Sequence, residues 1–326
     1  MAKARQVYID APGDPLNMQL RTVDLPSPEA GEVQLRQTAI GFNYIDVYQR
    51  SGKYALPLPS GLGHEAAGVV EAVGEGVTQF KPKDRVVYMN AGLGAYADRR
   101  NVAAEKLVAL PADVSDEDAV AVFFKGMTAQ YLLRKTYQVK PGDVVIVHAA
   151  AGGVGQILSR WASGLGAHVF GTAGSTEKCQ VALGAGCEAC IDYSDSSWVS
   201  ELLRVMDGRK ANVVYDSVAR HTFMGSLDCA APFGTVVLFG AASGPAPNID
   251  PELLNKKGCL FLTRPSVFPH NAVPATLREN AQEVFTAIRE GLIQPHIGAT
   301  FSMDQVVDAH IAAESRATSG AIVLIP

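Results

Sequence analysis

The chain has 326 residues, enough for roughly two domains of about 150 residues each. Its 28 lysine and arginine residues against 33 aspartate and glutamate residues give a net charge of −5, which argues against a surface for nucleic acid or anionic membrane. A hydrophobic fraction of 48% excludes a disordered chain. We find no signal-peptide core, no apolar run of about 18 residues and too few cysteines for a disulfide framework, so we expect a cytoplasmic protein without a membrane span.

The first third of the chain has the pattern of a mainly β body. Val33–Thr38 alternates polar and apolar residues, as a half-buried strand does. Gly68–Gly74 and Asp84–Tyr88 are further short strand-like runs, separated by glycine, proline, lysine and aspartate. No long helical period occurs before Ser115. We therefore predict a small, mostly antiparallel β domain.

From Val144 to Thr263, short apolar runs alternate with helical patterns. The runs are rich in β-branched residues, as are strands buried on both faces of a parallel sheet. They are Val144–Ala149, His168–Ala173, Asn212–Asp216, Thr235–Gly240 and Cys259–Thr263. This alternation is typical of a doubly wound α/β domain.

Beyond Arg264 the pattern changes again. Two amphipathic helices, Leu277–Glu290 and Met303–Ser315, precede a last strand at Ala321–Ile325. We expect this tail to rejoin the first body, which would make that domain discontinuous.

A glycine-rich turn directly follows the strand Val144–Ala149. Ala150, Gly152 and Gly155 occupy the three positions of a dinucleotide-binding fingerprint. These positions provide a tight turn, close approach of a pyrophosphate to the backbone, and close packing of helix on sheet. The helix that follows directs its free N–H groups at the anion. The turn therefore predicts a dinucleotide site, with a purely structural glycine turn as the alternative.

The residues after the next strand indicate which dinucleotide binds. An NAD-specific site places an acidic residue there, whereas this chain has Gly174 and Ser175, with Lys178 one turn later. A small residue, a hydroxyl and a cation suit a 2′-phosphate, so we predict NADPH. Lys178 as a solvated helix lysine is the alternative, and the neighbouring Glu177 does not fit a phosphate site. Tyr193, after the following strand, is a candidate neighbour of the adenosine phosphate.

Several segments, in order from about residue 35 to the C-terminus, carry a resemblance to a known family. They are Gly41–Tyr48, Arg50–Gly52, Gly63–Gly68, Lys125–Ala129, His148–Gly155, Tyr215–Val218, Thr263–Ser266 and Glu314–Thr318. The chain resembles the zinc-free NADPH:quinone oxidoreductase (zeta-crystallin-like) branch of the medium-chain dehydrogenase/reductase superfamily. The resemblance implies an α/β fold with a Rossmann doubly wound parallel sheet and a GroES-like mainly β domain.

The same resemblance implies the domain ranges, the assembly and the site. Residues 1–125 and 265–326 would form the GroES-like catalytic domain and residues 126–264 the Rossmann NADPH-binding domain, joined into a homodimer through Cys259–Thr263. The implied NADPH contacts near the nicotinamide are Asn43, Asp46, Tyr48 and Thr128. Those at the pyrophosphate are Gly152, Gly153 and Val154. Those around the adenosine phosphate are Gly174, Ser175, Lys178 and Tyr193. Those on the ribose and ring side are Ser217, Phe239, Gly240 and Ala241. Arg264 and Arg316 would come from the far wall of the cleft, although Arg316 as a surface helix-end cation is the alternative.

The positions that hold catalytic zinc in metal-dependent relatives carry poor ligands here. Zinc enzymes use three protein ligands and leave one position open. The corresponding positions hold Asn43 and Lys125, which leaves His64 as the one ligand-type residue. No cysteine precedes Cys179, so the structural zinc lobe is missing as well. We predict no metal site, and a packed or hydrogen-bonded His64.

The chemistry that remains favours a quinone as the acceptor. Reduction of a ketone needs a strong stabiliser for the developing alkoxide, whereas a quinone ring is electron-poor and becomes an aromatic hydroquinone. We predict an NADPH-dependent quinone reductase that works by positioning NADPH and acceptor. Asn43 would donate a hydrogen bond to a quinone oxygen, with Tyr48 or Tyr54 as a second polar group or a stacking surface.

Two alternatives stay open at this point. An NADPH-dependent alkenal or enone double-bond reductase also delivers hydride to a conjugated carbon without zinc. A protein that binds NADPH for a structural or RNA-binding role is the non-enzymatic alternative, and the net charge of −5 argues against RNA.

Overall fold

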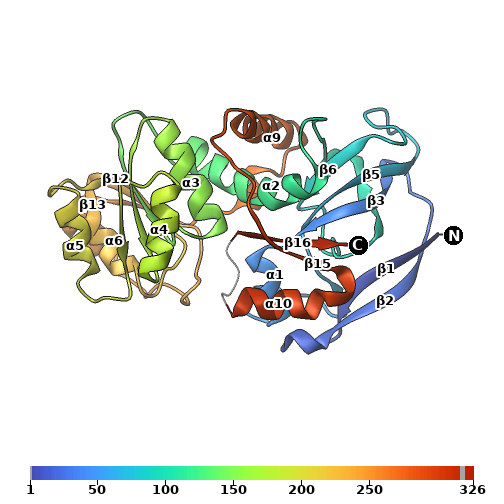
Figure 1. Ribbon diagram of the computed structural model, residues 1–326, viewed down its shortest axis with the longest axis horizontal. Helices are drawn as coiled ribbons and strands as arrows, with labels where there is room; N and C mark the ends of the chain where they lie inside the picture. The colour runs from blue at the N-terminus through green and yellow to red at the C-terminus, as the bar shows by residue number, and fades with distance from the viewer. Residues whose placement is uncertain (1, 316–319) are drawn as a thin grey trace. The chain divides into compact units, whose positions relative to one another are not determined.

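The computed structural model describes residues 2–315 and 320–326, which divide into two compact units (Figure 1). Unit 1 comprises Met1–Phe124, Asn271–Phe285 and Pro295–Pro326, and unit 2 comprises Lys125–His270 and Thr286–Gln294. Relative to the predicted ranges, residues 125, 265–270 and 286–294 lie with unit 2. The last of these segments packs against α3 (Gly153–Gly164), since a Cβ added to Gly164 would lie 2.2 Å from Cδ2 of Leu292.

Unit 1 is built on two sheets. In the described chain the larger sheet has the order β15-β16-β3-β5-β6-β8, with β7 paired to β3, and the smaller has the order β2-β1-β4. The first strands are β1 (Ala2–Ile9), β2 (Met18–Leu25), β3 (Glu32–Gly41), β4 (Ser60–Gly61) and β5 (Glu65–Val73). The others are β6 (Arg85–Met89), β7 (Arg99–Ala103), β8 (Leu107–Ala109), β15 (Ile297–Ser302) and β16 (Ala321–Ile325). Strands β3, β5 and β6 confirm the three strands predicted from the sequence in this region.

The C-terminal strand returns to the first body, as the sequence predicts. Strand β16 pairs antiparallel with β3, with Val323 opposite Gly41, and parallel with β15 on its other side. Its side chains enter one hydrophobic core with residues from β1, β3 and β6, including Val7, Leu35 and Tyr88. Burial of these apolar side chains holds the two ends of the chain together.

Four helices belong wholly or partly to unit 1 over the described residues. They are α1 (Tyr44–Arg50), α2 (Asp116–Tyr131), α9 (Pro274–Arg289) and α10 (Val306–Glu314), with 3-10 turns at Pro15–Asn17, Ala104–Lys106 and Met303–Gln305. Helices α9 and α10 confirm the two helices predicted in the tail.

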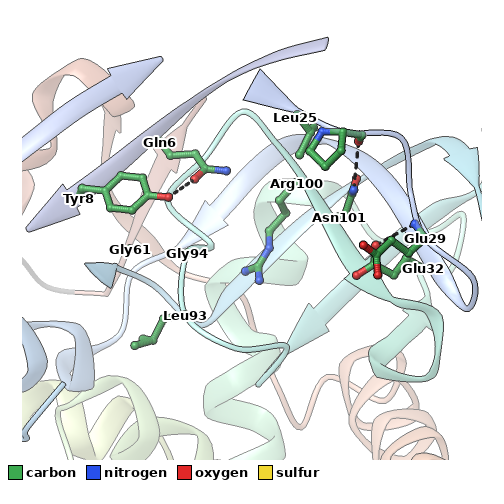
Figure 2. Close-up of a pocket in the computed structure, with 11 residues that line it drawn as sticks. Gln6, Tyr8, Leu25, Glu29, Glu32, Gly61, Leu93, Gly94, Arg100 and Asn101 are labelled. Carbon is green, nitrogen blue, oxygen red and sulfur yellow. Dashed lines mark hydrogen bonds between the residues drawn. The ribbon is translucent and has the colours of Figure 1, made fainter. Parts of the chain in front are cut away.

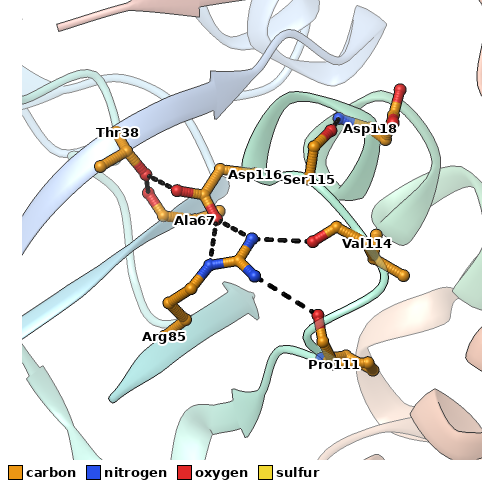
Figure 3. Close-up of polar contacts among 8 residues, drawn as sticks. All are labelled: Thr38, Ala67, Arg85, Pro111, Val114, Ser115, Asp116 and Asp118. Atoms are coloured by element: carbon orange, nitrogen blue, oxygen red, sulfur yellow. Dashed lines mark hydrogen bonds and ion pairs between the residues drawn. The ribbon is translucent and has the colours of Figure 1, made fainter. Parts of the chain in front are cut away.

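The start of α2 is fixed to the β-sheet by ionic hydrogen bonds (Figure 3). The guanidinium of Arg85 on β6 donates to the carboxylate of Asp116 at 2.5 and 3.0 Å, and to the carbonyl oxygen of Val114 at 2.7 Å. The other Asp116 oxygen accepts from the hydroxyl of Thr38 on β3 at 2.6 Å. Since Arg–carboxylate pairs are directional, this arrangement orients the helix that leads from unit 1 into unit 2.

Unit 2 contains a parallel sheet with the order β11-β10-β9-β12-β13-β14 over its described residues. Its strands are β9 (Val144–His148), β10 (His168–Ala173), β11 (Ala189–Asp192), β12 (Ala211–Asp216), β13 (Ala230–Leu238) and β14 (Phe261–Thr263). Its helices are α3 (Gly153–Gly164), α4 (Thr176–Gly184), α5 (Trp198–Val205), α6 (Phe223–Cys229), α7 (Glu252–Lys256) and α8 (Val267–His270), and a π-helical turn at Leu132–Thr136 follows α2.

This strand order is that of a Rossmann fold. The chain runs outward from β9 through β10 to β11, then crosses to β12 on the other side of β9 and continues outward to β14. Helix α3 packs with α4 and α5 packs with α6, so the two pairs flank the sheet (Figure 1). The switch of direction between β9 and β12 creates the position at which doubly wound sheets bind their ligands. The described residues contain no helix with the length and hydropathy needed to traverse a bilayer.

Candidate functional site

The predicted phosphate turn lies between β9 and α3, beside the switch point. The N–H of Ala150 donates to the carbonyl oxygen of Thr172 on β10 at 2.9 Å, and Gly152 is the N-cap of α3. A Cβ added to Gly155 would lie 2.3 Å from the carbonyl oxygen of Ala149, so the third fingerprint position admits only glycine without a shift of the backbone. The turn therefore brings backbone and helix N-terminus into the tight geometry that suits a pyrophosphate.

Lys125 is a neighbour of this turn that the sequence analysis considered only as a poor zinc ligand. A Cβ added to Gly153 would lie 3.0 Å from Cδ and 3.1 Å from Cε of Lys125. The aliphatic part of the lysine side chain thus packs against the first residue of α3. The position of Lys125 in the segment Lys125–Ala129 was a usable signal, since that segment carries part of the family resemblance.

The four residues predicted to surround the adenosine phosphate lie at the adjacent ends of β10 and β11. Ser175 is the N-cap of α4, and its Oγ accepts from the backbone N–H of Lys178 at 3.3 Å. A Cβ added to Gly174 would lie 3.3 Å from the hydroxyl oxygen of Tyr193, which places that hydroxyl beside the turn. The Lys178 side chain is exposed. These positions form a polar rim with a cation at the start of a second helix.

The residues predicted on the ribose and ring side follow the ends of β12 and β13. The hydroxyl of Ser217 donates to the carbonyl oxygen of His148 at 3.4 Å, and a Cβ added to Gly240 would lie 2.6 Å from the carbonyl oxygen of Ser217. Phe239 donates its N–H to the carbonyl oxygen of Asp216 at 2.9 Å. These contacts place the predicted residues together at the switch point.

Three other residues predicted to contact NADPH have contacts apart from those described above. Ala241 accepts from the N–H of Gly244 at 2.9 Å, and Thr128 is buried in α2. Arg264 is exposed and donates to the carbonyl oxygen of Leu238 at 3.0 Å. Arg316 lies outside the described residues.

A buried hydrogen-bond network ties three strand ends together below this edge. The ring nitrogens of His148 lie 2.7 Å from Oγ1 of Thr172 and 3.0 Å from Oγ of Ser226, whose hydroxyl donates to Asp216 at 2.8 Å. The other Asp216 oxygen accepts from two backbone N–H groups of the following loop. Burial lowers the pKa of His148, and the charge of Asp216 opposes the shift. This network could not be predicted from the sequence, because its members lie up to 78 positions apart in the chain.

In unit 1, Asn43 is held at the start of α1 by a buried glutamate. Glu65, which is 0% exposed, accepts from Nδ2 of Asn43 at 2.8 Å and from the N–H of Phe124 at 2.6 Å. Asp46 is also 0% exposed, and one of its oxygens accepts from the Asn43 N–H at 3.0 Å and from the Tyr96 hydroxyl at 2.9 Å. Burial and the neighbouring carboxylate both raise the pKa of Tyr96. The carboxylates of Asp46 and Glu65 therefore orient Asn43 from inside the protein.

An aromatic cluster lies on and after α1. The ring centroids of Tyr44 and Tyr48 are 5.2 Å apart, as are those of Tyr48 and Tyr54. Tyr44 is 43% exposed and Tyr54 is 41% exposed. Nζ of Lys53 lies 5.5 Å from the Tyr48 ring centroid. Tyr48 and Tyr54 were predicted from the sequence. Tyr44, one helical turn before Tyr48, and Lys53, directly before Tyr54, were given no role there.

His64 does not form part of a metal site in the described residues. It is buried, and its Nε2 donates to Oε1 of Gln49 at 2.9 Å, as expected for a packed or hydrogen-bonded histidine. Burial, with the charge of Arg100, lowers the pKa of His64 to about 4, so the ring is neutral at pH 7. The described chain contains no group of three or more histidine, cysteine, aspartate or glutamate side chains that could hold a metal ion.

A separate pocket of about 370 Å³ lies on unit 1 (Figure 2). Arg100 lines it, with Glu29 and Glu32 to one side and Tyr8 to the other. Arg100 donates to the carbonyl oxygen of Ala91 at 2.9 Å. None of the described residues that line this pocket is among the residues predicted for the site.

Comparison with known proteins decides the family. Residues 29–139 match the family model for the alcohol dehydrogenase GroES-like domain, and residues 153–280 match that for zinc-binding dehydrogenases. A quinone oxidoreductase of Pseudomonas aeruginosa is 44% identical over 324 residues, which cover 99% of this chain and 100% of that protein. The chain belongs to the quinone oxidoreductase family.

Two further relatives carry the name of a cofactor or of a substrate. The crystal structure of Escherichia coli quinone oxidoreductase complexed with NADPH has a TM-score of 0.95 and 43% identity to this chain, and covers 100% of both chains. A 2-haloacrylate reductase of Burkholderia is 41% identical over 322 residues, which cover 96% of each chain. The fold predicted from the sequence, a Rossmann sheet with a GroES-like domain, is that of this family.

Proposed function

We propose that this protein is an NADPH-dependent quinone reductase, in which quinone, NADPH and one proton yield hydroquinone and NADP⁺. The observation that carries the proposal is the glycine cradle at Gly155, followed one strand later by Ser175 and Lys178 where an NAD site would have an acid. The identity to quinone oxidoreductases over the full length supports the acceptor class.

The residues of unit 2 would hold and orient the cofactor. The backbone of Gly152, Gly153 and Val154 binds the pyrophosphate at the N-terminus of α3, and Lys125 adds a cation beside it. Lys178 and Ser175 bind the 2′-phosphate. NADPH supplies a hydride when bound. The network of His148 and Asp216 keeps the strand ends rigid, so that Ser217 and Gly240 present a preformed surface.

The residues of unit 1 would position the acceptor. Asn43 donates to a quinone oxygen, and Glu65 keeps its carboxamide in one orientation. In this proposal Asp46 acts as a positioning residue, because its buried carboxylate holds the N-cap of α1 and Tyr96. Tyr48 and Tyr54 offer aromatic faces and hydroxyls to a flat acceptor. No Lewis acid is required in this scheme, since the hydroquinone product is aromatic and its charge delocalised.

We also propose a homodimer joined through β14. This strand pairs with β13 and is the edge of the described sheet. Phe261 on β14 is 62% exposed and the neighbouring Phe233 is 70% exposed. An apolar, unpaired strand edge favours pairing with a second copy. Sedimentation of the wild type and of Phe261→Lys tests this, since the charged variant should dissociate.

Steady-state turnover tests the proposed reaction. Phenanthrenequinone and benzoquinone are compared with alkenals, each with NADPH and with NADH, after dialysis against a chelator. We expect quinone turnover with NADPH that survives the chelator. Activity on alkenals alone, or loss of activity with a stripped metal, would contradict the proposal.

The Burkholderia relative favours a second candidate. Its name describes an enzyme that reduces a 2-haloacrylate, and a 2-haloacrylate is a conjugated alkene rather than a quinone. Reduction of an electron-poor carbon–carbon double bond by NADPH is therefore the alternative, and the alkenal arm of the same panel distinguishes the two.

A further inference from the structure

We propose that Lys53 makes the acceptor site selective for acceptors that carry an anionic substituent, such as a carboxylate or sulfonate. This inference rests on the proposed function, because it assumes that the acceptor lies against the tyrosines. It concerns a residue that the family motifs do not assign, and it narrows the substrate class.

The backbone holds Lys53 next to the aromatic cluster. The N–H of Tyr54 donates to the carbonyl oxygen of Tyr48 at 3.0 Å, which closes the chain from the end of α1 into a turn. Gly52 has φ of +81° in this turn, a conformation that glycine adopts readily. Lys53 consequently lies in this turn, directly before Tyr54 in the chain.

The ammonium group of Lys53 lies near the Tyr48 ring rather than in an ion pair. Its Nζ lies 5.5 Å from the Tyr48 ring centroid, within cation–π range. In the described part of the chain no carboxylate lies within ion-pair distance of it. The positive charge is therefore available to a ligand.

Acidic groups near this turn are engaged elsewhere. Asp14 accepts from the N–H of Leu16 at 2.9 Å, and Glu314 accepts from the buried Arg50 at 2.6 Å. Asp46 is buried below α1 and hydrogen-bonded. The ammonium of Lys53 is thus the charged group that lies against the Tyr48 ring, although the whole chain carries −5.

An acceptor stacked on Tyr48 or Tyr54 would place a ring substituent near the ammonium. A charge pair at about 6 Å in a solvated site changes affinity by about threefold, and reversal of the lysine charge by about tenfold. Salt weakens such a pair because the exposed charges are screened. A neutral acceptor gains no corresponding ionic attraction.

Steady-state kinetics with two naphthoquinones tests the inference. The probes are a naphthoquinone sulfonate and the uncharged menadione, both with saturating NADPH. The quantity compared is the ratio of kcat/KM for the sulfonate to that for menadione, in the wild type and in Lys53→Gln and Lys53→Glu. Comparing the ratio between variants cancels the difference in reduction potential between the quinones.

We expect the ratio to fall about threefold in Lys53→Gln and about tenfold in Lys53→Glu, with both effects reduced at high salt. Lys140→Gln is the matched control. Lys140 is exposed and lies in unit 2, and its substitution by glutamine changes the net charge by the same amount as Lys53→Gln. Its ratio should equal that of the wild type.

A ratio that is unchanged in both Lys53 variants, or that falls equally in Lys140→Gln, overturns the inference and leaves the proposed function intact. Failure of the wild type to reduce either quinone with NADPH is a different result. It would refute the proposed function, and the selectivity with it.

Discussion

Substitution of Gly155 by alanine should weaken NADPH binding through a defined clash. The added Cβ would lie 2.3 Å from the carbonyl oxygen of Ala149 and 2.8 Å from Cα of Ala150. Both atoms belong to the backbone of the turn, so no side-chain rotation relieves the overlap. Ordinary contacts begin near 3.4 Å, and α3 must therefore move from the turn by about 1 Å.

The size of the effect follows from this displacement. A movement of about 1 Å takes an N–H···O contact of about 2.9 Å beyond hydrogen-bond distance. Loss of one hydrogen bond to a charged phosphate oxygen costs about 1.5–3 kcal/mol, or roughly 10- to 150-fold in Kd. Overpacking itself should lower the free energy of unfolding by about 1–3 kcal/mol.

Titration of NADPH by nicotinamide fluorescence, together with thermal unfolding, measures both quantities. Gly184→Ala is the matched control, because a Cβ added to Gly184, at the end of α4, meets no atom within 4 Å. We expect this control to bind NADPH like the wild type and to be equally or slightly more stable. A Gly155→Ala variant with wild-type Kd would refute the argument that the close turn forms the phosphate site.

Three further predictions concern single side chains. Lys178→Ala should lower the preference for NADPH over NADH by about 10- to 150-fold, measured as the ratio of kcat/KM values; an unchanged ratio would mean that Lys178 is a solvated helix lysine. Glu65→Gln leaves one acceptor oxygen for two N–H groups, so one of these hydrogen bonds is lost. The free energy of unfolding in urea should fall by about 1–3 kcal/mol and kcat should fall; a variant as active and stable as the wild type would contradict the positioning role. Burial, with the charge of Arg50, lowers the pKa of His310 to about 3. Between pH 6.5 and 3 the unfolded chain therefore binds more protons than the folded protein. The contribution of His310 to the free energy of unfolding is complete above pH 6.5. Below pH 6.5 it falls by up to about 1.4 kcal/mol per pH unit. Unfolding of His310→Leu across that range should show a shallower pH dependence, and an unaltered slope would contradict the assignment.

The elements of the Rossmann unit could be predicted because each has a local pattern. Strands β9, β10 and β12 are short apolar runs, and the fingerprint around Gly155 follows one of them directly. The first 32 residues gave no such signal, since β1 and β2 mix polar and apolar residues. Their pairing depends on a separate small sheet, and β15 likewise depends on β16.

The amino-acid sequence alone determined the two-part organisation, the glycine-rich turn after β9 and the polar rim at Ser175 and Lys178, because these depend on neighbours within a few residues. The tertiary structure decided which groups surround them. Glu65 reaches Asn43 across 22 positions and Phe124 across 59, and Lys125 reaches Gly153 across a helix and a strand. Contacts over such separations arise from packing and topology, and no periodicity along the chain records them.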